Sequence, residues 1–306
     1  MKTLMATDGS KESTTALRTA SRLIRQDGNE VDVLCVAPEF YPLKSKSRAA
    51  SANQNKIRQH YQRRIAQETK AILDKAMTAL LSRSIAAHTV SEIGSPADII
   101  VRMADEYEVT VVGSKGKFTA ANVGLGPVAS RVVERAQGVV LVARELTTDE
   151  NLRVLIAVDG SLASINALKV MREFFNLSGA EITLIHVKET PWIHLGLERE
   201  WFDYATDTFD KSDPEIQLEI EFQREAEAVL EEAQNRLDKL NYSVSTVIQE
   251  GNPATEILGE AENGDYDLII LGATGSVDAK HHMLGSVSAK VAWQAPCSVA
   301  IVRFIE

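Results

Sequence analysis

The sequence contains little cysteine and no long apolar run. Cys35 and Cys297 are the only cysteines among 306 residues. This excludes a disulfide framework and indicates buried structural thiols in a reducing compartment. No run of about 18 uninterrupted apolar residues is present, so we expect no membrane span. The N-terminal residues also lack the apolar core of a signal peptide, and we therefore expect a cytoplasmic protein.

Several motifs of nucleotide and metal enzymes are also missing. No G-x-x-x-x-G-K-[ST] is present, which argues against a P-loop NTPase. The stretch GLGPVA at 124–129 fits a dinucleotide fingerprint, but the preceding strand is expected to end near Gly113, too far upstream for that motif. His281 and His282 have no further ligands nearby, so we predict no metal site. No Ser/His/Asp arrangement can be assembled, and we assign no catalytic residue.

The two halves of the chain carry net charges of opposite sign. Residues 1–148 hold 21 basic and 15 acidic residues, whereas 149–306 hold 12 basic and 28 acidic residues, so the net charges are +6 and −16. The segment 41–64 has seven Lys/Arg and no Asp/Glu, and its counterpart 189–232 has 14 Asp/Glu and three Lys/Arg. These segments are either solvated lids or a surface for a protein partner or second subunit. Nucleic-acid binding is unlikely, because the second half is acidic.

The chain repeats itself once. Its second half repeats three blocks of the first, with offsets that grow from 151 to 157 to 159 residues: 4–20 with 155–171, 92–116 with 249–275, and 124–144 with 283–303. Such long self-similarity indicates two copies of one domain of about 150 residues. We predict domains at 1–146 and 151–306, joined by a short polar stretch.

Each copy alternates strands with helices. In the second copy we predict five strands, at Leu152–Val158, Ile182–Val187, Val244–Ile248, Leu268–Leu271 and Ser298–Val302. Helices are predicted after the turn Asp159-Gly160-Ser161 and at Pro214–Leu240, Pro253–Glu262 and Gly285–Gln294, with Asp213 as an N-cap. This alternation predicts an α/β fold with a doubly wound parallel sheet. Ligands of such sheets bind beyond the carboxyl ends of the strands.

A glycine pattern follows the fourth strand of the second copy. Gly272, Gly275, Gly285 and Ser286 form G-x2-G-x9-G-S, which ends where a helix begins. Because a helix N-terminus favours anions, this loop is a candidate phosphate site. The groups available there are the amides of Gly275, Ser286 and Val287 and the hydroxyls of Ser286 and Ser288. The alternative is a flexible crossover loop with glycines at its helix boundary.

With these features the chain resembles a tandem universal stress protein. The resemblance covers nearly the whole sequence, because each half resembles one domain of the family. The family's ATP signature is G-x2-G-x9-G-[ST], which the second half matches residue for residue. The resemblance implies two five-stranded, Rossmann-like domains of the adenine nucleotide alpha hydrolase-like type. It also implies ATP as the ligand, and any Mg²⁺ bound with it would be held mainly by the phosphates and water. The predicted nucleotide residues are Asp159, Val187, Gly272, Thr274, Gly275, Gly285, Ser286, Val287 and Ser288.

The first half departs from the signature. Its glycines keep their spacing, but Pro127 replaces the Ser/Thr and Ala129 stands where the second half has Ser288. Proline supplies neither a hydroxyl nor an amide hydrogen, so we expect a weaker or vestigial site, which Lys115 or Lys117 could restore in part. Its residues are Asp8, Val36, Gly113, Gly116 and Gly126.

The resemblance favours a nucleotide-responsive binding or signalling module in a stress response. The alternatives are an interaction scaffold that needs no nucleotide, or an enzyme with at most slow ATP hydrolysis. The edge strands at Gly138–Ala143 and Ser298–Val302 lead us to expect an intramolecular pseudo-twofold pair of domains. Homodimerisation of the whole chain is the second arrangement that we consider, and the sequence names no protein partner.

Overall fold

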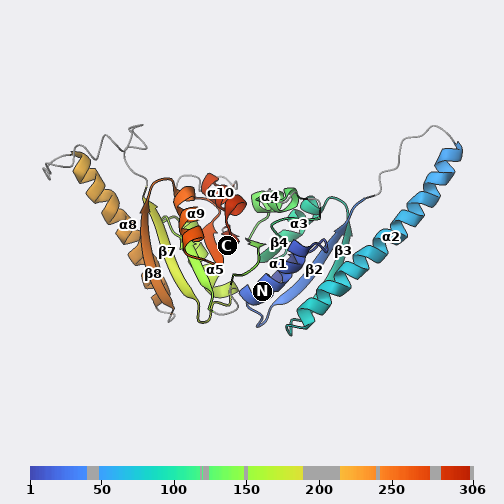
Figure 1. Cartoon of the computed structure of the whole chain (residues 1–306), viewed down its shortest axis with the longest axis horizontal. Helices are drawn as coiled ribbons and strands as arrows, with labels where there is room; N and C mark the ends of the chain where they lie inside the picture. The colour runs from blue at the N-terminus through green and yellow to red at the C-terminus, as the bar shows by residue number, and fades with distance from the viewer. Residues whose placement is uncertain are drawn as a thin grey trace. The chain divides into compact units, whose positions relative to one another are not determined.

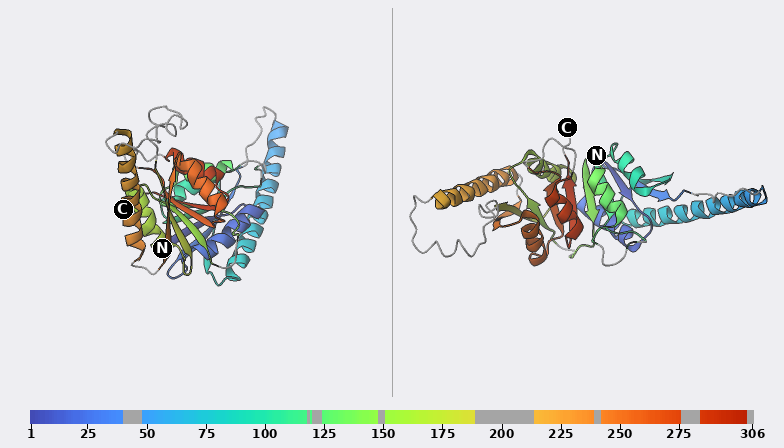
Figure 2. Two further views of the ribbon diagram at one scale, coloured as in Figure 1. Left: turned by 60° about the vertical axis from the view of Figure 1, so that its left-hand side comes forward. Right: turned by 90° about the horizontal axis from the view of Figure 1, so that it is seen from above.

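The chain forms two compact units, Met1–Glu145 and Leu146–Glu306. The computed structural model describes residues 1–39, 48–117, 119, 124–147, 151–188, 214–238, 242–275 and 284–303 (Figures 1 and 2). Asp213, His281, His282 and most of the acidic segment 189–232 lie outside these ranges. No helix among the described residues is both long and apolar enough to span a membrane.

The first unit is a five-stranded parallel sheet flanked by helices. Its order along the chain is β1 (Lys2–Ala6), α1 (Lys11–Leu23), β2 (Glu30–Ala37), α2 (Arg48–Leu81), β3 (Ala87–Ile93), α3 (Pro96–Ala104), β4 (Val109–Gly113), α4 (Pro127–Arg135) and β5 (Val139–Ala143). The strands lie in the order β3-β2-β1-β4-β5. The long α2 packs along β2 and β3 (Figure 1).

The second unit repeats this topology. Its elements are β6 (Arg153–Ala157), α5 (Leu162–Phe174), β7 (Glu181–Lys188), α8 (Pro214–Asp238), β8 (Ser243–Glu250), α9 (Pro253–Asn263), β9 (Leu268–Gly272), α10 (Ser286–Gln294) and β10 (Ser298–Val302). The order β8-β7-β6-β9-β10 is the same as in the first unit. The predicted α/β class and doubly wound parallel sheets are thus confirmed.

Apolar strands explain the buried sheets. Every residue of β5 (VVLVA) and β10 (SVAIV) is buried, as expected for parallel strands that are covered on both faces. The helices pack in pairs, α1 with α2 and α3 with α4 in the first unit, and α5 with α8 and α9 with α10 in the second. Both cysteines are buried and free, Cys35 in β2 and Cys297 one residue before β10.

Most predicted boundaries agree with the observed ones to within one or two residues. The strand Ser298–Val302 is as predicted. Gly285 precedes α10 as its N-cap instead of being its first residue. Similarly, β5 starts at Val139 and not at Gly138, whose φ of 68° takes it out of the strand conformation. At that glycine, an added Cβ would lie 2.9 Å from the carbonyl oxygen of Glu108.

Candidate functional site

An Asp-Gly-Ser turn joins the first strand to the first helix in both units. Gly9 and Gly160 have φ values of 74° and 75°, a conformation that favours glycine. The following serines are N-caps, and the Oγ of Ser161 accepts a hydrogen bond from the amide of Ser164 at 3.2 Å. The turn places Asp8 and Asp159 at the carboxyl edge of their sheets, where ligands of doubly wound folds bind.

The glycines of the second unit are required by close approaches. A Cβ on Gly272 would lie 2.9 Å from the carbonyl carbon of Ala163 in α5, so this glycine lets strand and helix pack. A Cβ on Gly275 would lie 3.0 Å from Oδ2 of Asp159, so the loop backbone runs beside that carboxylate. The structure therefore brings Gly275 and Asp159 together, although 116 positions separate them in the chain.

Helix α10 begins with an exposed serine. Gly285 adopts φ −67° and ψ 154° as the N-cap, and its amide donates to the carbonyl oxygen of Ala273 at 2.8 Å. Ser286 follows as the first helical residue and is exposed, and Val287 is half-buried. Ser288 behaves differently, because it is 5% exposed and its Oγ donates to the carbonyl oxygen of Gly272 at 2.7 Å.

The second strand of this unit ends in a charged cluster that sequence reasoning missed. Val187 is half-buried and pairs with Gln249 of β8. The next residue, Lys188, contacts the carboxylates of Glu219 in α8 and of Glu250 in β8, and its side chain is only 11% exposed. Burial alone would lower the pKa of Lys188, but the two carboxylates raise it above its ordinary value.

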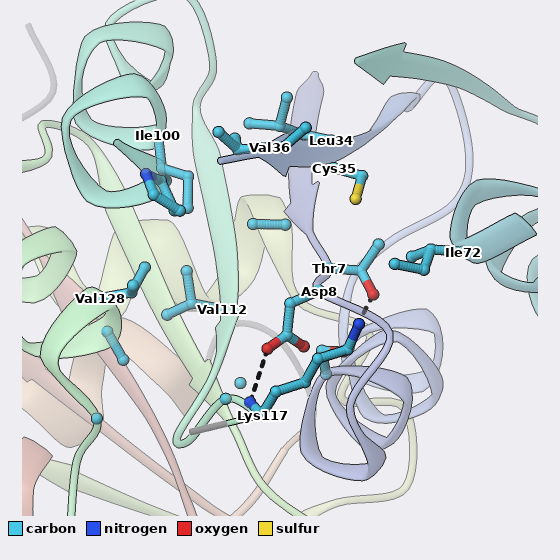
Figure 3. Close-up of a pocket in the computed structure, with 18 of the residues that line it drawn as sticks. Thr7, Asp8, Leu34, Cys35, Val36, Ile72, Ile100, Val112, Lys117 and Val128 are labelled. Atoms are coloured by element: carbon cyan, nitrogen blue, oxygen red, sulfur yellow. Dashed lines mark hydrogen bonds between the residues drawn. The ribbon is translucent and has the colours of Figure 1, made fainter. Parts of the chain in front are cut away.

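The first unit contains a cavity of about 470 Å³ at the carboxyl edge of its sheet. Its walls come from the ends of β1, β2 and β4, from one face of α2, and from the starts of α3 and α4. Figure 3 shows Val36, Ile100, Val112 and Val128 on one side of this space and Asp8 with Lys117 on another. The five residues predicted for the first half all line this cavity: Asp8, Val36, Gly113, Gly116 and Gly126.

The polar residues at the edge of this cavity form hydrogen bonds and an ion pair with one another. The amide of Lys117 donates to Oδ2 of Asp8 at 2.9 Å, and the Lys117 ammonium pairs with Oε1 of Glu68 in α2 at 3.1 Å. Burial alone would raise the pKa of Asp8, but hydrogen bonds from Ser10, Lys117 and Ser13 lower it, and the net shift is downward. Sequence reasoning named Lys117 only as a possible phosphate ligand and did not anticipate this ion pair.

Among the described residues, no group of three or more His, Cys, Asp or Glu side chains is placed to hold a metal ion.

Comparisons with known proteins agree with the internal repeat. A profile of the universal stress protein family matches residues 1–144 and again 150–303. The chain is 31% identical to a universal stress protein of Bacillus subtilis over 151 residues, which are 49% of this chain and 98% of that protein. It is 29% identical to one of Methanocaldococcus jannaschii over 157 residues, covering 50% of this chain and 84% of that protein.

A solved structure has the same fold over the whole chain. A universal stress protein from Archaeoglobus fulgidus superimposes with a TM-score of 0.66 at 20% identity, and the match covers 99% of this chain and 98% of that one. At this identity the likeness is evidence of fold alone. The two profile matches establish that the chain belongs to the universal stress protein family, with two family domains in tandem.

Proposed function

We propose that the chain binds an adenine nucleotide, foremost ATP, in its second unit and acts as a nucleotide-responsive binding or signalling module in a stress response. One observation carries the proposal. The complete G-x2-G-x9-G-S pattern lies at the carboxyl edge of the second sheet, where Gly275 runs beside Asp159 and the exposed Ser286 opens α10. A helix N-terminus that begins with an exposed hydroxyl is suited to a phosphate chain.

Each part of the nucleotide has a proposed partner. The adenine lies near Val187, and the ribose lies near Asp159 or Gly272. The phosphates rest on the loop and the helix start, with Ser286 as the hydroxyl donor. Ser288 Oγ donates to the carbonyl oxygen of Gly272. It takes part either by accepting a hydrogen bond from the nucleotide or by releasing Gly272 and donating to a phosphate. The remaining contacts come from Thr274, Gly275, Gly285 and Val287. Magnesium is held mainly by the phosphates and water.

Two other functions are weaker candidates. An interaction scaffold that needs no nucleotide would use the charged faces of α2 and α8, because Arg63 and Arg64 are exposed on the former and Glu231 and Glu232 on the latter. A weak ATPase requires a group beside the γ-phosphate that activates water, and we assign none.

Calorimetric titration with MgATP tests the proposal. The whole chain should bind about one nucleotide. Ser286→Pro should weaken this binding about a hundredfold or more, because the substitution removes one hydroxyl and one amide that donate hydrogen bonds to the charged phosphates. Proline fits this position, since Gly126 precedes Pro127 with φ −72° and ψ 162°, close to the conformation of Gly285.

The matched control is Pro127→Ser, which adds the missing hydroxyl to the first unit. It should leave the number of sites at about one per chain, because the loop amides of that unit are already engaged. Two equal sites in the unaltered protein would contradict the proposal. Binding that survives Ser286→Pro unchanged would contradict it as well, and no binding at all would favour the scaffold.

A further inference from the structure

The cavity of the first unit is formed even though the phosphate motif beside it is incomplete. We propose that this cavity binds an uncharged, largely apolar small molecule and not a nucleotide. The proposal goes beyond the nucleotide site of the second unit and does not depend on it. Three features of the first unit carry it: the loop amides, the charges at the edge, and the apolar walls.

The loop amides that would hold a phosphate are engaged within the protein. The amide of Gly116 donates to Oγ1 of Thr119 at 3.2 Å, and that of Lys117 donates to Oδ2 of Asp8 at 2.9 Å. Pro127 has no amide hydrogen to add. A phosphate in this place would therefore have to break existing hydrogen bonds, at a cost comparable to the bonds that it gained.

The charges at the edge of the cavity balance one another. Two ammonium groups, of Lys115 and Lys117, line the cavity together with two carboxylates, of Asp8 and Glu68. The Lys117 ammonium is paired with Glu68, and the lowered pKa of Asp8 keeps this carboxyl ionised near neutral pH. The local net charge is zero, so the edge offers no excess positive charge to an anionic ligand.

The walls of the cavity are mainly aliphatic. Apolar side chains reach it from β2, α2, α3, β4 and α4: Leu34, Val36, Ile65, Ile72, Ile100, Val112 and Val128. Figure 3 shows that Val36, Ile100, Val112 and Val128 gather around one side. A volume of about 470 Å³ is within the usual range for small-molecule sites. Burial of apolar ligand surface against these walls is favourable.

Titration with the uncharged fluorescent probe N-phenyl-1-naphthylamine tests the proposal. We expect about one probe to bind per chain, and we expect saturating MgATP not to displace it. Val36→Trp should fill the cavity and weaken probe binding about tenfold or more, which corresponds to about 1.4 kcal/mol. The matched control is Val187→Trp at the equivalent position of the second unit, which should leave the probe bound.

The same two variants separate this proposal from the nucleotide proposal. Val187→Trp should impair MgATP binding in calorimetry, and Val36→Trp should not. If Val36→Trp fails to fold by circular dichroism, Ile65→Trp replaces it. Ile65 is half-buried on α2, and the equivalent residue of α8 is already aromatic, Phe222.

A charge variant tests the selectivity directly. Glu68→Gln removes the partner of the Lys117 ammonium without changing the apolar walls. The anionic probe 1-anilinonaphthalene-8-sulfonate should then bind several-fold more tightly, while binding of the uncharged probe should stay the same. The proposal is overturned if the uncharged probe does not bind, if MgATP displaces it, or if Val187→Trp removes it and the first-unit variants do not.

Discussion

The two units share one backbone plan but differ in the groups that this plan presents to a ligand. Gly113 and Gly272 both lie against the first helix of their unit, where a Cβ would approach the helix backbone to 3.2 Å and 2.9 Å. These glycines are thus required for packing, whatever is bound. The helix starts diverge, with Pro127 in the first unit and Ser286 in the second. The comparison teaches that the same glycine pattern can maintain the fold while the side chains at the helix start differ.

A second difference lies where the second and third strands end. The second unit has Lys188 between Glu219 and Glu250, whereas the first unit has Ala37 and the exposed Ile93 at the positions of Lys188 and Glu250. The first unit therefore has an apolar strand end beside its cavity, and the second has a charged one. Three predictions follow the differences between the units, from the largest expected effect to the smallest.

The largest effect is expected at the aspartate that precedes β9. Asp267 is buried, and it accepts hydrogen bonds from the amide and hydroxyl of Thr147 and from the amide of Arg153, at 2.8–3.1 Å. Asp267→Ala should destabilise the second unit by about 3 kcal/mol, because three hydrogen bonds to a buried carboxylate are lost. The equivalent residue of the first unit is the half-buried Glu108, which accepts from the amide of Lys2. Glu108→Ala should cost about 1 kcal/mol.

Urea denaturation measures both effects. Trp192, Trp201 and Trp293 are the only tryptophans, so their fluorescence follows the second unit, and far-ultraviolet circular dichroism follows both. Equal losses of stability for the two variants would contradict the asymmetry.

A smaller effect is expected for Lys188. Lys188→Met should destabilise the second unit by about 2 kcal/mol, because Glu219 and Glu250 are left half-buried without their cation. Since the folded pKa of Lys188 is raised, its contribution is present below pH 10.5 and is lost as the pH rises through the folded pKa. Lys169→Met, on the exposed face of α5, is the control and should change stability little. If the difference in stability between Lys188→Met and the unaltered protein is the same in strong alkali as at neutral pH, the charged cluster does not stabilise the second unit as proposed.

The smallest effect concerns Asp8 and pH. Asp8→Asn should destabilise the first unit by about 1 kcal/mol at neutral pH, since an uncharged amide accepts the Lys117 amide more weakly than a carboxylate does. The folded pKa of Asp8 is lowered, so its contribution is present above 3.8 and is lost as the pH falls through the folded pKa. Circular dichroism during urea unfolding should show the variant and the unaltered protein converging in acid. Divergence in acid would refute this role.

Much of the fold could be predicted from the sequence. The internal repeat predicted two domains, and the apolar strands separated by helical stretches predicted parallel sheets. The glycines also correctly indicated the carboxyl edge of the sheet, because Gly272 ends strand β9 and Gly285 is the N-cap of helix α10.

The local chemistry was harder to predict. The cluster at Lys188 depends on Glu219, which lies in a helix that follows a long insertion, so nothing near Lys188 in the sequence signals the contact. The first-unit cavity was missed because a degenerate motif suggested a lost site. The engagement of the amides of Gly116 and Lys117 depends on the loop conformation, which brings Thr119 and Asp8 to them.

The central claim is that the adenine nucleotide lies in the second unit. Photolabelling with 8-azido-ATP, followed by proteolysis and mass spectrometry, tests it most directly, because the reactive nitrogen sits on the adenine ring. We expect the label on peptides from residues 151–303, in particular the peptide that carries Val187, and we expect excess ATP to prevent it. Label that ATP suppresses on peptides from residues 1–144 instead, such as the one that carries Val36, would contradict the account.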